Sequence, residues 1–266
     1  MSAVRPLVRL QQVDKVYANG TVALHQLNLD ILPDEFITLL GPSGCGKSTA
    51  LRLIAGMGDI SAGNIDWPRS FYDAYANPLR EIGFVFQEPT LMPWSSVFEN
   101  VYLPLKLKGV PRKEAESAVM ETLDMVGLAR FAEVYPRELS GGMKMRVSIA
   151  RALVTKPRLL LMDEPFAALD EITRARLNDD LLTIWQRTRC TVVFVTHSVY
   201  ESVYLSSRIV VFAARPGRII GEVAVAAPYP RDEAFRLTPS YAERCGAVSS
   251  LLNEASQGAL CEGERA

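Results

Sequence analysis

Several patterns that would assign a protein to a class at once are missing from this sequence. Its four cysteines are far apart in the sequence, at Cys45, Cys190, Cys245 and Cys261. This spacing excludes a paired metal-binding motif and a disulfide framework. No apolar run approaches the roughly 20 residues of a membrane-spanning helix, so we expect that the chain itself does not cross a bilayer. Lys and Arg number 29 against 30 Asp and Glu, and this balance gives no reason to expect a nucleic-acid partner.

The first five residues also lack the basic start and apolar stretch of an export signal, which predicts a cytoplasmic location. At 266 residues and 48% hydrophobic composition, the chain can bury one large core or two lobes that share one. A disordered or fibrous class is therefore excluded, and the function has to be sought in motifs.

Hydrophobic periodicity predicts an α/β protein. Residues 8–31 alternate between apolar and polar, which indicates antiparallel strands turned at Asn19-Gly20. Further on, buried strands alternate with helices, and this order is typical of a parallel sheet covered on both faces. We expect strands at 36–40, 159–162, 191–196, 208–213 and 218–225, and helical segments at 48–56, 97–130, 173–187 and 239–255.

A glycine-rich motif lies between the first buried strand and the first helix. Gly41-Pro-Ser-Gly-Cys-Gly46-Lys47-Ser48 fits the phosphate-loop pattern, in which backbone N–H groups and a helix N-terminus cradle phosphates. Lys47 is expected to reach the β- and γ-phosphates of ATP, and the Ser48 hydroxyl to bind Mg²⁺. Cys45 is interpreted as structural, with a redox-sensitive thiol as the alternative. The full set of expected ATP-binding residues here is Gly41, Pro42, Ser43, Gly44, Cys45, Gly46, Lys47, Ser48 and Thr49.

Two carboxylates end the apolar strand 159–162. Asp163 is a candidate Mg²⁺ ligand, and Glu164 is a candidate base for the water that attacks the γ-phosphate. His197 follows the strand 191–196 and is a candidate hydrogen-bond donor to the γ-phosphate. The alternatives are two solvated carboxylates at a loop start and an ordinary structural histidine.

Leu139-Ser140-Gly141-Gly142, followed by a helix with Arg146 and Arg151, resembles the signature of ABC ATPases. The similarity covers residues 8–221. It implies that Tyr17 stacks on adenine, that Gln87 contacts Mg²⁺ or the attacking water, that Asp170 belongs to the D-loop, and that His197 is the switch histidine. It also implies that Ser140, Gly141 and Gly142 act on ATP held by a second copy, because two ATP molecules are sandwiched between two subunits.

The family's fold is expected with this resemblance: a P-loop NTPase core of the RecA type, an N-terminal antiparallel β subdomain and an inserted α-helical subdomain. The ABC ATPase domain is then 1–225, divided into core and β subdomain (1–87 and 152–225) and helical subdomain (88–151). Residues 226–266 form a short, partly helical tail.

Within the family, the chain is most similar to importer ATPases of the nitrate, sulfonate and taurine group. The resemblance lies in Gln87-Glu-Pro-Thr-Leu-Met-Pro-Trp94, in residues 163–170, in Thr173-Arg174 and in Arg215-Pro-Gly-Arg218. It implies a homodimer at the cytoplasmic face of a membrane, bound to permease subunits and served indirectly by a solute-binding protein. Nitrate, alkanesulfonates, taurine and pyrimidine vitamin precursors all remain open as solutes. The alternatives are a soluble non-transport ABC ATPase, such as one for iron–sulfur cluster assembly, a nucleotide-binding module without turnover, and an exporter.

Four residues depart from the family pattern: Met143 and Met145 replace glutamines, Ser198 replaces a common aspartate, and Ala167 replaces glycine. None is a phosphate, metal or water ligand, so an active ATPase is still expected. The segment 88–100 carries Trp94 and Phe98, and we predict that it forms a groove for a short permease helix. An ordinary buried aromatic cluster is the alternative for Trp94.

Overall fold

The computed structural model describes residues 4–70, 80–214 and 216–263, with the side chains of 256–263 excepted. Arg215, the first residue of the Arg215-Pro-Gly-Arg218 motif and of the turn expected at 215–217, therefore lies outside the described residues. The chain divides into two compact units, unit 1 (1–80 and 191–266) and unit 2 (81–190). Within the described ranges no helix combines the length and the apolarity that a membrane crossing requires.

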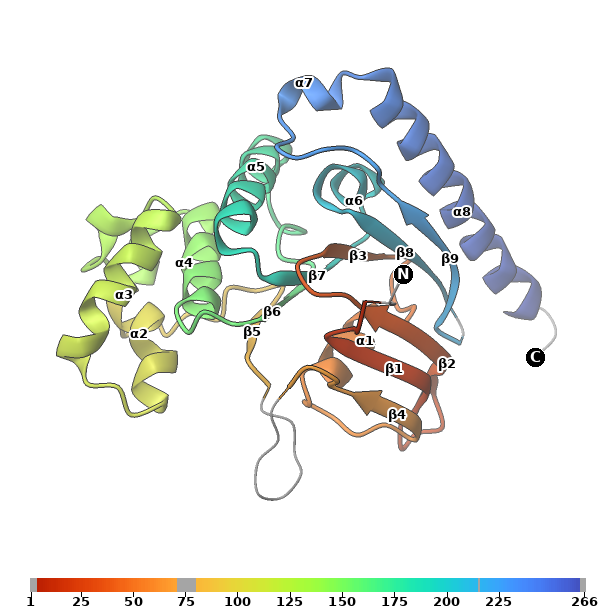
Figure 1. Cartoon of the computed structure of the whole chain (residues 1–266), viewed down its shortest axis with the longest axis horizontal. Helices are drawn as coiled ribbons and strands as arrows, with labels where there is room; N and C mark the ends of the chain where they lie inside the picture. The colour runs from red at the N-terminus through yellow and green to blue at the C-terminus, as the bar shows by residue number, and fades with distance from the viewer. Residues whose placement is uncertain (1–3, 71–79, 215, 264–266) are drawn as a thin grey trace. The chain divides into compact units, whose positions relative to one another are not determined.

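Unit 1 begins with the predicted antiparallel strands, shown in red and orange in Figure 1. Strand β1 (Val8–Val16) lies between β2 (Val22–Ile31) and β4 (Ala62–Asp66). The β1–β2 turn closes through a hydrogen bond from the Tyr17 N–H to the Thr21 carbonyl, at 2.9 Å. Val8, Leu10 and Val13 of β1 are buried, whereas Val16 at its end is 41% exposed. A register shift between Leu10 and Val13 interrupts the period of two, so the alternation holds only for part of the strand.

The second sheet of unit 1 carries parallel strands. Strand β3 (Phe36–Leu40) pairs in parallel with β7 (Thr191–Thr196) on one side and β8 (Arg208–Ala213) on the other, and β9 (Arg218–Ala224) adds an antiparallel edge. Every residue of β3 and β7 is buried, as expected for strands covered on both faces.

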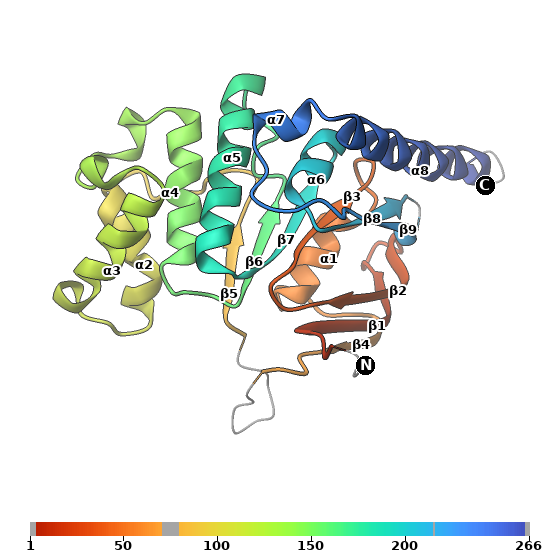
Figure 2. The same ribbon diagram turned by 45° about the horizontal axis from the view of Figure 1, so that its top comes forward.

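Helices cover this sheet and extend the chain beyond it. They are α1 (Lys47–Ile54), α6 (Val199–Leu205), α7 (Glu233–Arg236) and α8 (Pro239–Gly263). Figure 2 shows α8 lying along β8 and β9, and it also packs against α6. Arg231 fixes the segment before α7, because its buried guanidinium donates to the Val203 and Tyr204 carbonyls at the end of α6, at 3.0 and 2.9 Å.

Unit 2 holds the predicted helical region. Strands β5 (Ile82–Val85) and β6 (Leu159–Asp163) pair in parallel. The expected helical stretch 97–130 forms two α-helices, α2 (Val97–Leu107) and α3 (Arg112–Met125), followed by a short 3-10 turn. Helix α4 (Gly141–Leu153) packs against α2, α3, β5 and α5 (Glu171–Thr188) and is therefore the central helix of this unit (Figure 1).

Candidate active site

The phosphate loop, residues 41–48, leaves β3 and enters α1 as the motif predicts. Two of its glycines are required by close backbone contacts. A Cβ on Gly41 would lie 2.7 Å from the Phe212 carbonyl oxygen, and one on Gly46 would lie 2.6 Å from the Ala23 carbonyl oxygen. Gly46 also has a φ of +92°, which side chains rarely adopt. The loop is thus seated against β2 and β8, and this contact fixes its shape.

Lys47 lies inside the loop with only 4% of its surface exposed. Its ammonium group donates hydrogen bonds to the carbonyl oxygens of Gly41 and Pro42, at 2.8 and 2.9 Å. Helix α1 starts at this residue, has no acidic residue in its first turn, and receives no hydrogen bond to a side-chain cap. A buried cation beside an uncapped helix N-terminus is an arrangement suited to an anion such as a phosphate group.

Cys45 belongs to the phosphate loop, and its side chain is buried. Its side chain is 1% exposed, and its Sγ lies 3.6 Å from the Lys47 ammonium nitrogen. Burial raises the pKa of this thiol, although the Lys47 charge acts in the opposite direction. The reactive thiolate is therefore disfavoured, which supports the structural interpretation over the redox-sensitive one.

Strand pairing brings His197 to the same sheet edge as the phosphate loop. Leu40 of β3 is paired with Thr196 of β7, so Gly41 and His197 both follow the carboxyl ends of adjacent parallel strands. The His197 side chain is exposed there. Ser198, one of the departures from the family pattern, caps helix α6 by accepting a hydrogen bond from the Glu201 N–H at 3.3 Å. A serine does at this position what a capping aspartate would do.

Tyr17 lies beside the first turn of α1. Its hydroxyl oxygen is 3.2 Å from the Thr49 Oγ1, and 42% of the residue is exposed. The Lys15 ammonium group lies 5.3 Å from the centre of its ring. Unit 1 therefore brings together the phosphate loop, an exposed aromatic ring and His197.

Unit 2 brings together the acidic residues and Gln87 in the same way. Val85 of β5 is paired with Met162 of β6. Asp163 is the last residue of β6, and Glu164 and Gln87 lie just beyond the ends of these two adjacent strands. Asp163 is 7% exposed, whereas Gln87 is exposed. Glu164 has a φ of +46°, an uncommon conformation for a residue with a side chain and one that is found more often at functional sites. Nothing in the sequence revealed this strain.

The signature and the D-loop also meet within unit 2. Ser140 is the N-cap of α4, and its hydroxyl accepts a hydrogen bond from the Met143 N–H at 3.3 Å. A Cβ on Gly142 would lie 2.9 Å from the Thr173 Cγ2, in the first turn of α5. Asp170 is the N-cap of that helix, and the hydrogen bond from the Thr173 N–H lowers the pKa of its carboxyl group.

Sequence reasoning gave no role to Arg151 at the end of α4. Its guanidinium donates to the Pro89 and Thr90 carbonyls, at 2.8 and 2.9 Å, and to the Thr90 hydroxyl at 3.0 Å. It thereby fixes the chain just after Gln87. The second methionine of the signature, Met145, is 2% exposed and belongs to the core of unit 2, which explains why an apolar residue suits that position.

The two aromatic residues of segment 88–100 have opposite environments. Trp94 is 76% exposed, which excludes a buried aromatic cluster for this residue. Phe98 is 3% exposed, and the Arg112 guanidinium lies 4.5 Å from the centre of its ring. The Phe98 side chain is therefore buried. It does not line an open groove, contrary to our expectation for this segment. Asn100 holds the loop in place, because its amide donates to the carbonyls of Ser95 and Ser96, at 3.1 and 2.9 Å.

A family model described as ABC transporter matches residues 24–167, just over half of the chain. An ATP-binding protein of Brucella abortus is 46% identical over 90% of both chains. A nitrate import ATP-binding protein of Synechocystis is 43% identical, covering 88% of this chain and 89% of its own. An aliphatic sulfonates import ATP-binding protein of Bacillus cereus is also 43% identical, over 85% of this chain and 89% of its own.

Solved structures similar to this chain also come from ABC transporter ATP-binding proteins. CbiO1 from Clostridium perfringens, part of an ABC transporter complex, superposes with a TM-score of 0.73 and 26% identity over 83% of this chain and 89% of its own. A dimeric ATP-binding cassette bound to ADP and Pi superposes with a TM-score of 0.69 and 34% identity over 83% of this chain and all of its own. They confirm the predicted α/β fold of the P-loop NTPase type, with its β and helical subdomains. The chain therefore belongs to the ABC transporter family, as one of the ATP-binding subunits that hydrolyse ATP to power transport.

Proposed function

We propose that this chain powers the import of a small oxoanion by hydrolysing Mg-ATP as a dimer bound to a membrane permease. The observation that carries the proposal is the phosphate loop, with Lys47 buried inside it at the uncapped start of α1. The relatives named for nitrate and aliphatic sulfonates support the solute class, since both solutes are small anions with oxygen atoms around a nitrogen or sulfur centre.

In this proposal the phosphate loop, residues 41–49, binds the triphosphate. Its residues other than Pro42 can provide backbone N–H groups, and Lys47 provides a positive charge. Tyr17 stacks on the adenine, because its exposed ring lies beside Thr49 at the same helix start. The Ser48 hydroxyl and the Asp163 carboxylate fit Mg²⁺, which prefers hard oxygen ligands and completes its shell with phosphate oxygens and water. When bound, the ion would neutralise charge that develops on the phosphates.

Hydrolysis is assigned to three side chains. Glu164 orients and polarises the attacking water, and the strained backbone at this residue supports a catalytic role. His197 donates a hydrogen bond to the γ-phosphate from the strand end beside the phosphate loop. Gln87 contacts Mg²⁺ or the water, and it connects this event to the segment 88–100 that follows it.

The site is complete only in a dimer. Ser140, Gly141 and Gly142 open a helix whose first N–H groups suit an anion, and we propose that they bind the ATP held by the partner's phosphate loop. Asp170 lies at the neighbouring helix start and belongs to the same contact surface. The similar cassette that is dimeric and bound to ADP and Pi supports this arrangement.

Coupling to the permease is assigned to the helical subdomain, residues 88–151, as distinct from the core and β subdomain (1–87 and 152–225) and the tail (226–266). The 76% exposed Trp94, held on a loop that Asn100 fixes, offers an apolar contact for a permease helix. The subunit would then lie peripherally at the cytoplasmic face of the membrane, and a solute-binding protein would deliver the anion on the other side.

The test begins with Glu164→Gln in the purified protein. We expect it to bind ATP normally, to lose turnover by about 10²-fold or more, and to accumulate an ATP-dependent dimer in size-exclusion chromatography. Lys47→Ala, as a control, should bind ATP poorly and remain monomeric. Turnover at the normal rate in Glu164→Gln would disprove the assignment of the base.

The transport proposal is tested by co-expressing the chain with the permease subunits encoded beside it and reconstituting them in proteoliposomes. We expect ATP-dependent uptake of nitrate or an alkanesulfonate. Copurification with soluble partners only, and no assembly with a permease, would favour the non-transport ATPase instead.

A further inference from the structure

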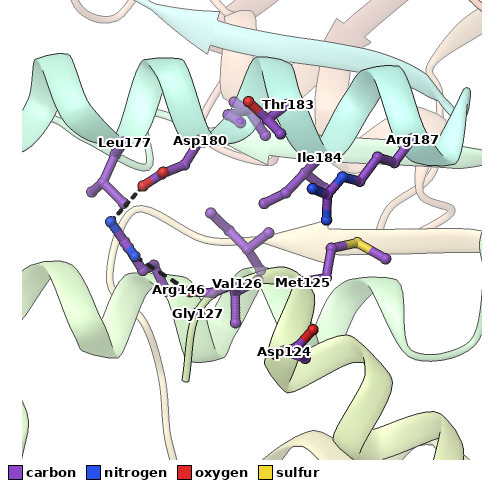
Figure 3. Close-up of a pocket in the computed structure, with 12 residues that line it drawn as sticks. Asp124, Met125, Val126, Gly127, Arg146, Leu177, Asp180, Thr183, Ile184 and Arg187 are labelled. Carbon is purple, nitrogen blue, oxygen red and sulfur yellow. Dashed lines mark hydrogen bonds and ion pairs between the residues drawn. The ribbon is translucent and has the colours of Figure 1, made fainter. Parts of the chain in front are cut away.

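An ion pair links the signature helix to the D-loop helix. The Arg146 Nη2 of α4 lies 2.5 Å from the Asp180 Oδ2 of α5, and the Arg146 Nη1 donates to the Val126 carbonyl at the end of α3, at 3.3 Å. Figure 3 shows this guanidinium extending from α4 to both partners. One side chain therefore ties three helices of unit 2 together.

The ion pair borders a cavity of about 340 Å³. Its walls come from the end of α3, from α4 and from α5, and they include Ile149 and Leu181. Met125 and Ile184 also line it, from α3 and α5 (Figure 3). This cavity opens to solvent, because the Arg146 and Asp180 side chains at its border are 29% and 40% exposed. Ile149 of α4 and Leu181 of α5 are buried, so the two helices are packed behind it. The ion pair therefore joins α4 and α5 at the solvent side of their interface.

The same two helices approach closely at their N-terminal ends, where a Cβ on Gly142 would lie 2.9 Å from the Thr173 Cγ2. Arg146 lies six residues after Ser140, about 9 Å along the helix axis, and Asp180 lies ten residues after Asp170, about 15 Å. The Cβ on Gly142 would also lie 3.9 Å from the Leu177 Cδ1, so this contact extends over about one turn of α5. The ion pair adds a polar contact farther along both helices and opposes a change in the angle between them.

We propose that Arg146 and Asp180 are positioning residues, which hold the signature and the D-loop in one fixed relation so that both meet the partner's nucleotide together. This inference rests on the proposed function, because it needs a composite site in a dimer. Neither residue touches ATP, so their loss affects assembly and turnover of the closed dimer and leaves the phosphate loop of the same chain unaffected.

The experiment compares wild type, Asp180→Asn, Arg146→Asp, and the charge-swapped double variant Arg146→Asp/Asp180→Arg. We expect Asp180→Asn to lower kcat about tenfold, with the affinity of the monomer for a fluorescent ATP analogue unchanged within twofold. In the Glu164→Gln background, the same change should raise the ATP concentration needed for dimerisation. The swapped double variant should recover most of the activity that Arg146→Asp alone loses, which a purely local packing role would not predict.

Arg187→Gln is the matched control, because Arg187 lines the same cavity from α5 and its guanidinium has no hydrogen-bond or ion-pair partner within the described part of the chain. It should keep full activity. The inference is overturned if Asp180→Asn retains the wild-type kcat, if the swapped variant is no better than the single variants, or if Arg187→Gln loses as much as Asp180→Asn. An inactive wild-type protein would instead refute the proposed function, so the two failures are distinguishable.

Discussion

Replacing Trp94 by alanine should separate coupling from stability. Trp94 is 76% exposed, so only about a quarter of its surface is buried against the rest of the protein. The truncation to alanine removes only the packing of that buried part. Truncating a fully buried Trp or Phe costs about 3–5 kcal/mol, and a quarter of that is about 1 kcal/mol. In a domain of this size the Tm should fall by no more than about 4 °C.

The same truncation at Phe98 should behave differently. Phe98 is 3% exposed and also contacts the Arg112 guanidinium, so Phe98→Ala should cost the full 3–5 kcal/mol, with about 0.5–1 kcal/mol more from the cation–π contact. Its Tm should fall by about 10 °C. Although the two aromatic residues are only four positions apart, Trp94 is expected to contact a partner protein and Phe98 to stabilise the fold.

The assay is ATP hydrolysis by the purified subunit and by the proteoliposome complex with its permease. Trp94→Ala should hydrolyse ATP normally alone and lose most of the stimulation that the permease provides. Leu107→Ala is the matched control, because Leu107 is 79% exposed but lies at the end of α2, outside segment 88–100. Normal stimulation in Trp94→Ala, or equal loss in Leu107→Ala, would refute the reasoning.

Five further outcomes follow from the structure. Gly46→Ala should abolish ATP binding in an equilibrium titration, since its Cβ would lie 2.6 Å from the Ala23 carbonyl oxygen. Ser140→Ala should lower the free energy of unfolding by about 1 kcal/mol in urea, because α4 loses its cap; Ser140→Arg, mixed into dimers, should stop hydrolysis at the site it faces. Cys45 should react with an alkylating reagent far more slowly in the folded protein than after unfolding, since it is 1% exposed and burial raises its pKa. Burial also raises the pKa of Asp180. The contribution of Asp180 to the free energy of unfolding is therefore greatest at acid pH, and it decreases as the pH rises from the pKa of the unfolded state to that of the folded state. The free energy of unfolding of the wild type, relative to that of Asp180→Asn, should decline over this pH range.

The phosphate loop could be predicted from the sequence because its determinants are local. Strand, glycines, lysine and helix follow one another within residues 36–54, and each imposes its conformation on its immediate neighbours. The alternation in residues 8–31 and the buried strands were predictable for the same reason. These predictions depend on the local sequence and its hydrophobic periodicity. They do not depend on which distant segments are in contact in the folded protein.

Contacts between distant segments could not be predicted in this way. Arg151 donates to carbonyls about 60 positions earlier, and Arg146 pairs with Asp180 on another helix. Trp94 and Phe98 looked alike in the sequence, because both are aromatic residues in a proline-rich segment, and only their packing separates them. The strain at Glu164 is likewise imposed by its surroundings.

Several candidate functional residues lie at helix starts, and the capping of these helices differs. Within the described residues, α4, α5 and α6 each carry a side-chain cap, from Ser140, Asp170 and Ser198. Helix α1 begins after Gly46 without one. A side-chain cap satisfies N–H groups that a ligand would otherwise bind, so an uncapped helix retains its donors for the phosphates. The signature is intermediate, because Ser140 satisfies the Met143 N–H while Gly141 and Gly142 place no side chain at the helix start. In the dimer that we propose, this difference would suit α1 to tight binding within one chain and α4 to a contact with the partner's nucleotide that forms and breaks with each cycle of hydrolysis.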